Sequence, residues 1–440
     1  MQLRFSVPLS TLLLMMFVPD ARALTLEEAI HRALERNERG LAAGETAEAA
    51  RARVARARSF LLPELTATGD WTRRSHETTR TVDGVTSVLS TRDGLEGRLS
   101  LNQVIFDARA FPLLREAKHS RDAAEFDAVE VRRQLAFDTA EIYLTVLAGE
   151  QVVRAAGERR DLADQNTREV RVRFGAQLVS SNDVSRAELE SAVAERELVE
   201  ARGAVRVARL ALSHLLDQPV TDSLEVPMTL LHGATEVPPM ADVPDGTAPT
   251  DTAAVDRRPD VLASRSRVEA LEAAADEPTA RYLPQVNFNA QGWATNEAGF
   301  GGRGEDWNLG LGLTWPIFDG GDREAAKSER DALARAGALD LKNQERGVAV
   351  EIASARVAVE SRQATLTQSD VAVQAARRNA AESAELYRRG LIRALEAVDA
   401  NVQLFEAEVE KTRAQFTLAL AWLDLKAALG YDPLTETGIP

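Results

Sequence analysis

Residues 307–315 read Trp-Asn-Leu-Gly-Leu-Gly-Leu-Thr-Trp, so that every second side chain is apolar. Successive side chains of a β-strand point to opposite faces, and the stretch therefore predicts a strand with one apolar face. Three further segments, starting at Leu65, Leu95 and Val286, alternate in the same way. Each is long enough to cross a bilayer as a tilted strand, which takes about 9–11 residues. The pattern is typical of transmembrane barrel strands.

The tryptophans support a membrane location for these segments. Trp71, Trp307 and Trp315 lie towards the ends of the alternating segments, where an aromatic girdle at the membrane interface would place them. Trp293 has the parity of the polar face and does not fit this pattern. The alternative is an amphipathic sheet that covers a soluble core.

Four strands cannot complete a barrel. A sheet in lipid must pair every backbone N–H and C=O group, so an open four-stranded sheet is excluded there. Four strands are also too few to close around a lumen. We therefore expect several copies of the chain to share one barrel, to which each copy contributes two hairpins.

The remaining sequence is mostly helical in pattern. Two stretches, 107–174 and 319–389, have helical periodicity and would each extend about 100 Å at 1.5 Å per residue. No compact domain of this size holds such a rod, so we expect long helices that pack against similar ones. Shorter helices are expected at 25–61, 182–216, 259–282 and 394–429.

Three landmarks occur twice in the same order, which indicates an internal duplication. Leu62-Pro63-Glu64-Leu65 returns as Leu283-Pro284-Gln285-Val286, and Ile105-Phe106-Asp107 returns as Ile317-Phe318-Asp319. Arg173-Phe174-Gly175 is matched to Arg388-Arg389-Gly390. We therefore expect two fused structural halves.

The predicted organisation begins with an export signal at 1–23. Arg4 precedes a short apolar run, and Ala21-Arg22-Ala23 forms an A-x-A cleavage site that ends at Ala23. The expected segments that follow are a first repeat at 24–216 with a hairpin at about 63–106, a Pro-rich linker at 217–257, a second repeat at 258–429 with a hairpin at about 284–318, and a C-terminal segment at 430–440.

Composition excludes several classes of function. The 440 residues include no cysteine, which excludes disulfide frameworks, thiol nucleophiles and Cys-ligated zinc or iron–sulfur sites. A net charge of −15 argues against a nucleic-acid ligand. Beyond the first 25 residues no run of 18 apolar residues occurs, so no spanning helix is expected. No catalytic, metal or cofactor constellation is found, so we expect neither an enzyme nor a bound cofactor.

The motifs together resemble the TolC-type outer-membrane efflux proteins. The resemblance is carried by the following motifs: Leu24-Thr25-Leu26-Glu27-Glu28-Ala29-Ile30, Arg258-Pro259-Asp260-Val261, the Leu-Pro and Ile-Phe-Asp motifs that precede and follow each predicted hairpin, and Tyr387-Arg388-Arg389-Gly390-Leu391. The resemblance implies a mixed α and β membrane protein: a homotrimer with a twelve-stranded transmembrane β-barrel, four strands per protomer, continued by a long periplasmic α-helical barrel. It also implies docking to a periplasmic adaptor and to an inner-membrane pump of the RND or ABC type. The family's lipoprotein branch has an N-terminal cysteine, which this chain lacks.

The resemblance further implies a constriction at the periplasmic mouth. Rings of acidic side chains narrow the mouth in the family, and the matching positions are Glu396 and Asp399. An alternative is that these carboxylates only complement the N-terminal dipole of their helix. Tyr387 matches a position of the closing network. The first half departs from the family pattern at the partner position: Ser181 stands where the family often has an acid, and Asp183 follows two residues on.

The turns at 173–182 and 388–395 are the implied adaptor-docking tips, with Gly175, Gly390 and Leu391 as candidates. Gly175 and Gly390 are expected to supply the backbone freedom that a helix-to-helix turn needs. Without the resemblance, each glycine is simply a helix C-cap. The expected function is a passive outer-membrane duct, gated at its periplasmic end. The alternative from another class is a soluble periplasmic adaptor or scaffold built on a coiled-coil hairpin.

Overall fold

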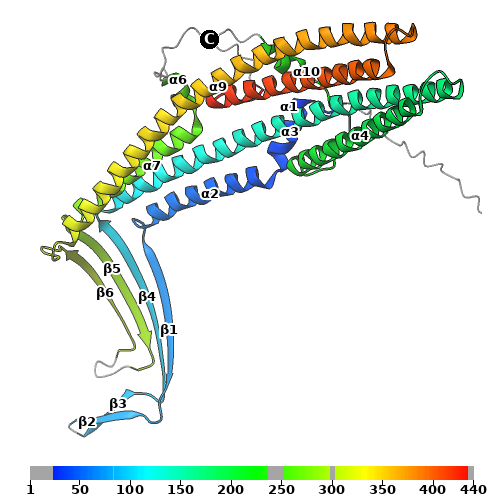
Figure 1. The fold of residues 1–440 in the computed structure, drawn as a ribbon. Coiled ribbons are helices and arrows are strands. Elements are labelled where there is room, and N and C mark those ends of the chain that lie inside the picture. The colour runs from blue at the N-terminus through cyan, green and yellow to red at the C-terminus, as the bar shows by residue number, and fades with distance from the viewer. Residues whose placement is uncertain (1–22, 83, 236–251, 298–302, 435–440) are drawn as a thin grey trace, which may run out of the picture.

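The computed structural model describes residues 23–82, 84–235, 252–297 and 303–434, so the expected export signal lies outside the described residues except for Ala23. A β-sheet forms one end of the molecule, and long helices extend away from it (Figure 1). Each half of the chain follows the same order: a helix leads into a strand pair, a helix of more than 60 residues returns from the sheet, and a shorter helix pairs with its far part.

The four alternating segments form the strands of one antiparallel sheet, as predicted. They are β1 (Glu64–Arg73), β4 (Asp93–Phe106), β5 (Gln285–Thr295) and β6 (Glu305–Thr314), in the order β1-β4-β5-β6. One row across the sheet runs through Leu65, Leu101, Ala290 and Leu309. The next row runs through Thr66, Ser100, Gln291 and Asn308. The register therefore gathers the apolar side chains of all four strands on one face.

The pattern did not predict a second, two-stranded sheet beyond β1 and β4. It consists of β2 (Thr78–Val82) and β3 (Val85–Ser90). Glu297, which follows β5, accepts hydrogen bonds from the Thr91 backbone N–H and from Arg74. The β2–β3 hairpin is thus tied at its base to the end of the other hairpin.

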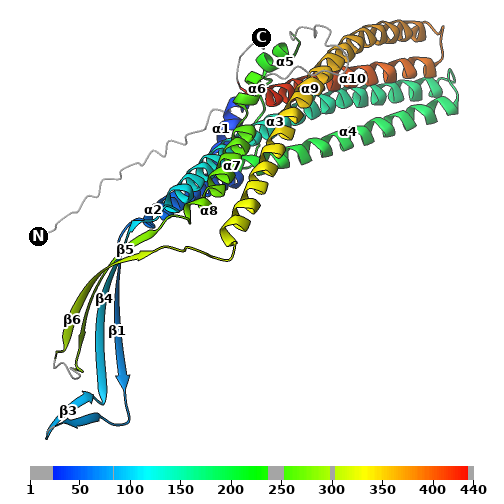
Figure 2. The same cartoon turned by 90° about the vertical axis from the view of Figure 1, so that its left-hand side faces the viewer.

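Four helices form a slab directly next to the sheet. They are α2 (Glu38–Ser59), α3 (Ala110–Gly175), α7 (Pro259–Ala275) and α9 (Asp322–Arg388), and they lie in that order across the slab (Figures 1 and 2). Further from the sheet, α4 (Ser181–Leu216) pairs with α3 and α10 (Ala394–Ala428) pairs with α9. The two long helices therefore run through both parts of the helical region.

Two of the predicted helices are interrupted. The stretch 25–61 forms α1 (Leu26–Arg36) and α2, because Asn37 has an extended backbone (φ −66°, ψ 126°) and its side chain caps α2 by accepting from the Arg39 N–H. The stretch 259–282 ends as α7 at Ala275, and a single turn, α8 (Glu277–Ala280), follows with Pro278 inside it. The linker also contains α5 (Met228–Thr235) and α6 (Thr252–Arg257).

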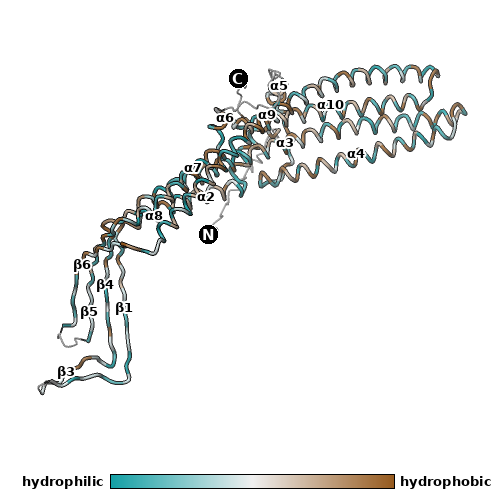
Figure 3. Tube along the Cα trace, turned by 60° about the vertical axis from the view of Figure 1, so that its left-hand side comes forward, coloured by the Kyte–Doolittle hydropathy of each residue, from teal (hydrophilic) through white to brown (hydrophobic). Residues whose placement is uncertain are grey.

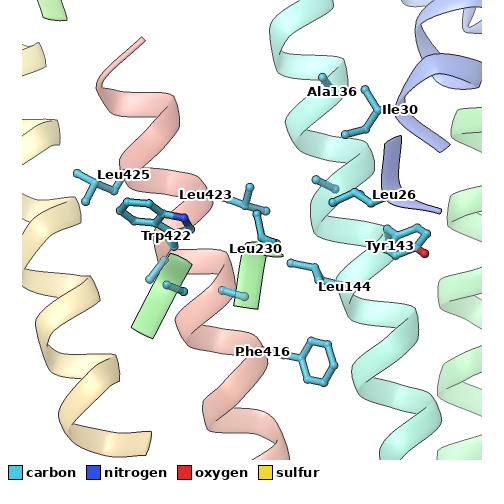
Figure 4. Packing of buried hydrophobic residues seen from close by; sticks show 14 of the residues in the cluster. Leu26, Ile30, Ala136, Tyr143, Leu144, Leu230, Phe416, Trp422, Leu423 and Leu425 are labelled. Atoms are coloured by element: carbon cyan, nitrogen blue, oxygen red, sulfur yellow. The ribbon is translucent and has the colours of Figure 1, made fainter. Parts of the chain in front are cut away.

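The largest hydrophobic core lies at mid-length, where α1, α5 and the end of α10 meet α3. Leu26, Leu144, Leu230 and Trp422 all lie within this cluster (Figure 4). The buried Tyr143 hydroxyl lies 2.6 Å from the Leu24 carbonyl oxygen and 2.7 Å from that of Glu225. These contacts attach both the start of the chain and the linker to α3.

Polar and apolar residues are interspersed along all the long helices (Figure 3). Among the described residues, none of the helices combines the length and apolarity that a bilayer span requires.

The C-terminus of α10 is held by three arginines from two other parts of the chain. Arg133 of α3 donates to the Ala427 carbonyl at 2.9 Å, Arg257 to that of Leu429 at 3.3 Å, and Arg258 to that of Ala428 at 3.5 Å. Arg258 also binds Asp260 at 2.8 Å. Cations at a helix C-terminus satisfy free carbonyls and complement the helix dipole. This cluster therefore fixes α10 to α3 and to the start of α7.

Candidate functional site

The two helix turns farthest from the sheet have the same backbone geometry. In the α3–α4 turn the Leu178 N–H donates to the Arg173 carbonyl, and in the α9–α10 turn the Leu391 N–H donates to the Leu386 carbonyl, both at 2.9 Å. This 6→1 bond is the mark of a Schellman cap, which needs a left-handed residue just before the donor. That residue is Gln177 (φ 60°) in the first turn and Gly390 (φ 73°) in the second.

The prediction that Gly175 provides the backbone freedom of the first turn is therefore wrong. Gly175 is the last residue of α3, and Gln177 occupies the left-handed position. Matching the two turns by their glycines placed them two residues out of register. The hydrogen bonds match Phe174 to Tyr387 and Leu178 to Leu391 instead.

Because of this difference, introducing a glycine in the first turn and removing the glycine of the second turn should have opposite effects on stability. A left-handed backbone costs a non-glycine residue about 1 kcal/mol. Gln177→Gly should therefore stabilise the first turn, and Gly390→Ala should destabilise the second by a similar amount. Hydrogen exchange of the tip amides should slow in the first variant and quicken in the second. Equal exchange in both variants would contradict the assigned backbone conformations.

Tyr387 and Arg173 bring the two tips together. The Arg173 guanidinium lies 4.6 Å from the centre of the Tyr387 ring, and it also pairs with Glu169 on its own helix. The Tyr387 hydroxyl oxygen is buried, and it has no hydrogen-bond partner in the part of the chain that the structure describes. Burial raises the pKa of Tyr387; Arg173 opposes this, whereas Glu169 and Asp183 add to it. The predicted closing-network residue thus lies at a contact between the halves.

The two first-half candidates have different surroundings. Asp183 and Ser180 form a capping box at the start of α4: the Asp183 N–H donates to Ser180 Oγ at 3.3 Å and the Ser180 N–H donates to Asp183 Oδ2 at 3.0 Å. The Ser180 hydroxyl, which donates to Asp183 Oδ2 at 2.7 Å, and the Ser180 N–H together lower the pKa of Asp183. Ser181 is exposed at the first position of α4. The capping role of Asp183 explains why an acid is present there.

Glu396 and Asp399 are exposed in the first turns of α10. They are three residues apart and so lie on the same side of the helix. Arg393, the N-cap residue, makes no side-chain capping bond to α10. The arrangement is compatible with both expected roles, since the carboxylates face solvent and also lie at the positive end of the helix dipole.

Exposed apolar side chains surround the two turns. Leu178 and Leu391, which occupy equivalent positions, are 74% and 68% exposed, and Val172 is 75% exposed. Apolar side chains gathered at the end of a molecule mark a contact surface. Leu391 was predicted from the sequence, whereas Leu178 and the cationic partner of Tyr387, Arg173, were not. Correct matching of the turns would have found Leu178.

The tryptophans lie near the two ends of the apolar sheet face. Trp71 pairs with Leu95 near the end of the sheet far from the helices, and Trp307 pairs with Gly292 near the same end. Trp315 lies at the helix end, where its indole N–H donates to the Tyr282 carbonyl at 3.0 Å. Trp315 follows Trp307 by eight positions, which corresponds to about 27 Å along an extended strand. This spacing resembles the roughly 25 Å apolar band of membrane barrels. Trp293 lies on the polar face, in register with Arg98 and Asp306.

Within the described ranges, no three histidine, aspartate or glutamate side chains come together in a way that could hold a metal ion.

Comparisons with known proteins agree with this arrangement. The model of a family described as outer membrane efflux protein matches residues 29–218 and 252–431. The alkaline protease secretion protein AprF of Pseudomonas aeruginosa is 24% identical over 432 residues, which cover 95% of this chain and 86% of AprF. The CmeC outer membrane channel of Campylobacter jejuni superposes with a TM-score of 0.75 at 18% identity, covering 93% of this chain and 87% of CmeC. VceC, an outer membrane protein of Vibrio cholerae, gives the same TM-score and identity and covers 93% of this chain and 96% of VceC.

Proposed function

Because the chain belongs to the outer membrane efflux protein family, we propose that it is the exit duct of a bacterial export system. In this proposal the sheet lies in the outer membrane and the helices extend into the periplasm. Substrates enter at the helix tips and leave through the sheet end without energy input from the duct itself. The observation that carries the proposal is the four-stranded sheet with one continuous apolar face, joined end-on to a slab of very long helices.

The open edges of the sheet support a trimer. Among the residues that the structure describes, β1 and β6 each pair with a strand on one side only. Unpaired backbone groups cannot remain exposed to lipid, so the edges must pair with other copies. Three protomers would give twelve strands, and their helices would continue the cylinder as an α-helical barrel. In this proposal the two halves of the chain, 24–216 and 258–429, are duplicated units joined by the linker 217–257 and followed by the segment 430–440.

The tips provide the proposed gate and docking surface. Glu396 and Asp399, repeated in three copies, would concentrate negative charge at the periplasmic mouth, with Tyr387, Ser181 and Asp183 close to the closing contacts. Leu178 and Leu391 would meet a periplasmic adaptor protein, and Gly390 shapes the turn that presents Leu391. An inner-membrane pump of the RND or ABC type would supply the substrate and the energy.

The soluble adaptor or scaffold is less well supported. An adaptor needs a single helical hairpin nested between the parts of a split β-domain. Here two helix pairs extend from the same sheet, and the apolar face of that sheet has exposed side chains such as Leu311, which is 73% exposed. A soluble protein would bury such a face against a core.

Cell fractionation tests the location. We expect the mature chain to sediment with outer membranes and to remain there after a high-salt wash, because its apolar sheet face is embedded in lipid. The mature protein should begin at Leu24, after cleavage at Ala23, and N-terminal sequencing would show this. A chain recovered wholly from the soluble periplasm would contradict the duct and favour the adaptor.

A further inference from the structure

The helical slab ends in two helices with a free side, α2 and α9. They lie at opposite edges of the slab, with α3 and α7 between them (Figures 1 and 2). Neighbouring helix axes are 8–10 Å apart, so within one chain α2 and α9 are separated by roughly 25–30 Å. α2 leads into β1 and β6 leads into α9. Any assembly that pairs β1 of one copy with β6 of the next therefore brings α2 of the first copy alongside α9 of the second.

Both edge helices carry exposed charges on their free sides. Glu45 and Arg53 lie on α2, away from the face where Ala47, Ala50 and Val54 are buried. Asp340 and Arg346 are exposed on α9. In the described part of the chain, none of these four residues forms an ion pair or a side-chain hydrogen bond.

The inward-facing charges of the same helices, in contrast, form ion pairs with neighbouring helices. Arg39 binds Asp138 at 2.8 Å and Arg51 binds Glu125 at 2.7 Å, so both are paired with α3. On α9, Arg330 binds Glu277 at 2.9 Å. The charges without a described partner are thus those that face outward from the slab.

The paired charges also fix the levels of the helices relative to one another. Arg51 is level with Glu125 of α3, Asp127 pairs with Arg267 of α7, and two residues away Arg265 lies 3.5 Å from Glu345 of α9. The residues of α2 near 49–51 are therefore level with those of α9 near 341–345. Because the two helices are antiparallel, Glu45 comes within one turn of the level of Arg346, and Arg53 within one turn of the level of Asp340.

We infer that two ion pairs, Glu45 with Arg346 and Arg53 with Asp340, join α2 of one copy to α9 of the next. The inference rests on the proposed trimer and identifies its helical seam. The two pairs have opposite polarity along the seam, so each cation meets an anion only in this register. Exposed apolar residues accompany them: Leu41 on α2 and Val350 on α9 are 53% and 64% exposed and come to similar levels. The charges thus select the correct edge and register, and the apolar contacts add attraction.

Cysteine cross-linking tests the seam directly, because the chain has no cysteine of its own. The double variants Glu45→Cys/Arg346→Cys and Arg53→Cys/Asp340→Cys, treated with a short bismaleimide in outer membranes, should give covalent dimers and trimers on denaturing gels. A cross-link within one chain would have to span the width of the slab. The matched control is Glu45→Cys/Glu329→Cys, whose α9 site lies about 25 Å away from the level of Arg346 at 1.5 Å per residue. It should remain monomeric on the gel.

Charge reversal provides a second readout. Arg53→Asp or Asp340→Arg alone should lower the temperature at which the detergent-solubilised trimer dissociates, and the double reversal should restore most of the loss. Native mass measurement distinguishes a failure of the inferred seam from a failure of the proposed trimer. A trimer in which the seam pairs do not cross-link, or in which the control pair cross-links equally, would overturn the inferred seam. A monomer would overturn the proposed trimer as well.

Discussion

The double variant Glu396→Ala/Asp399→Ala should raise single-channel conductance in planar bilayers and weaken the preference for cations. Three copies of each side chain would surround the mouth of the duct, and both are exposed at the start of α10. A carboxylate about 6 Å from a passing cation attracts it by about 0.7 kcal/mol in water before screening. Loss of several such charges should change the ratio of cation to anion permeability by roughly tenfold at low salt.

Two controls separate this role from the helix-dipole role. Glu329→Ala removes an exposed carboxylate near the sheet end of α9, and it should leave conductance and selectivity unchanged. If the carboxylates only complement the dipole of α10, the double variant should speed hydrogen exchange in the first turn of α10 while the channel properties stay as in the wild type. That outcome would contradict the acidic constriction.

Replacement of Arg258 by methionine should lower the free energy of unfolding more than any other single substitution proposed for this protein. The Arg258 side chain is 9% exposed and binds both Asp260 and Glu351, in addition to its contact with the end of α10. Its removal leaves the Asp260 carboxylate, which is 25% exposed, without its cation. Breaking a buried pair costs about 3–5 kcal/mol, and the partial exposure of the carboxylates reduces the expected loss to about 2–4 kcal/mol per protomer.

This loss should depend on pH. Burial tends to raise the pKa of Asp260, but the hydrogen bonds and charge of Arg258 outweigh burial and lower the pKa below its ordinary value of 3.8. A lowered pKa means that the stabilisation is complete above pH 4 and is lost as the pH falls further. Thermal unfolding in detergent, followed by circular dichroism, should show that the difference in Tm between wild type and Arg258→Met narrows below pH 4.

Arg257→Met is the matched control for Arg258. Arg257 contacts the Leu429 carbonyl and lies 4.6 Å from the centre of the Tyr431 ring. Its replacement removes a cation from the same helix end but leaves the Arg258–Asp260 pair in place. We expect a smaller loss of Tm, with the pH dependence of the wild type retained. Equal losses in the two variants would show that the pairing with Asp260 contributes little.

Periodicity was sufficient to predict the main elements of the fold. The alternation around Trp307 to Trp315 determines both the strand and its apolar face, because a strand has a period of two. The long helices followed from helical periodicity maintained over more than 60 residues. Local cues of this kind do not depend on which segments become neighbours.

The predictions that failed depend on tertiary contacts or on the conformation of one residue. The break at Asn37 coincides with a hydrogen bond from its side-chain amide to the Leu215 carbonyl, 178 residues away. Gln177 in a left-handed conformation was not expected, since Gly175 stood two residues earlier and glycine favours that conformation. The Arg173–Tyr387 contact joins the two halves, and no spacing within either half could reveal it.

Planar-bilayer recording of the unmodified protein tests the central proposal most directly. The purified mature chain, added in detergent to one side of the bilayer, should insert and produce discrete, uniform current steps. The open channel should be more permeable to cations than to anions. The steps should come from a trimer, as measured by native mass on the same preparation. A properly folded chain that stays in solution, or that binds the bilayer without opening any conducting path, would contradict the proposal that this protein is a duct through the outer membrane.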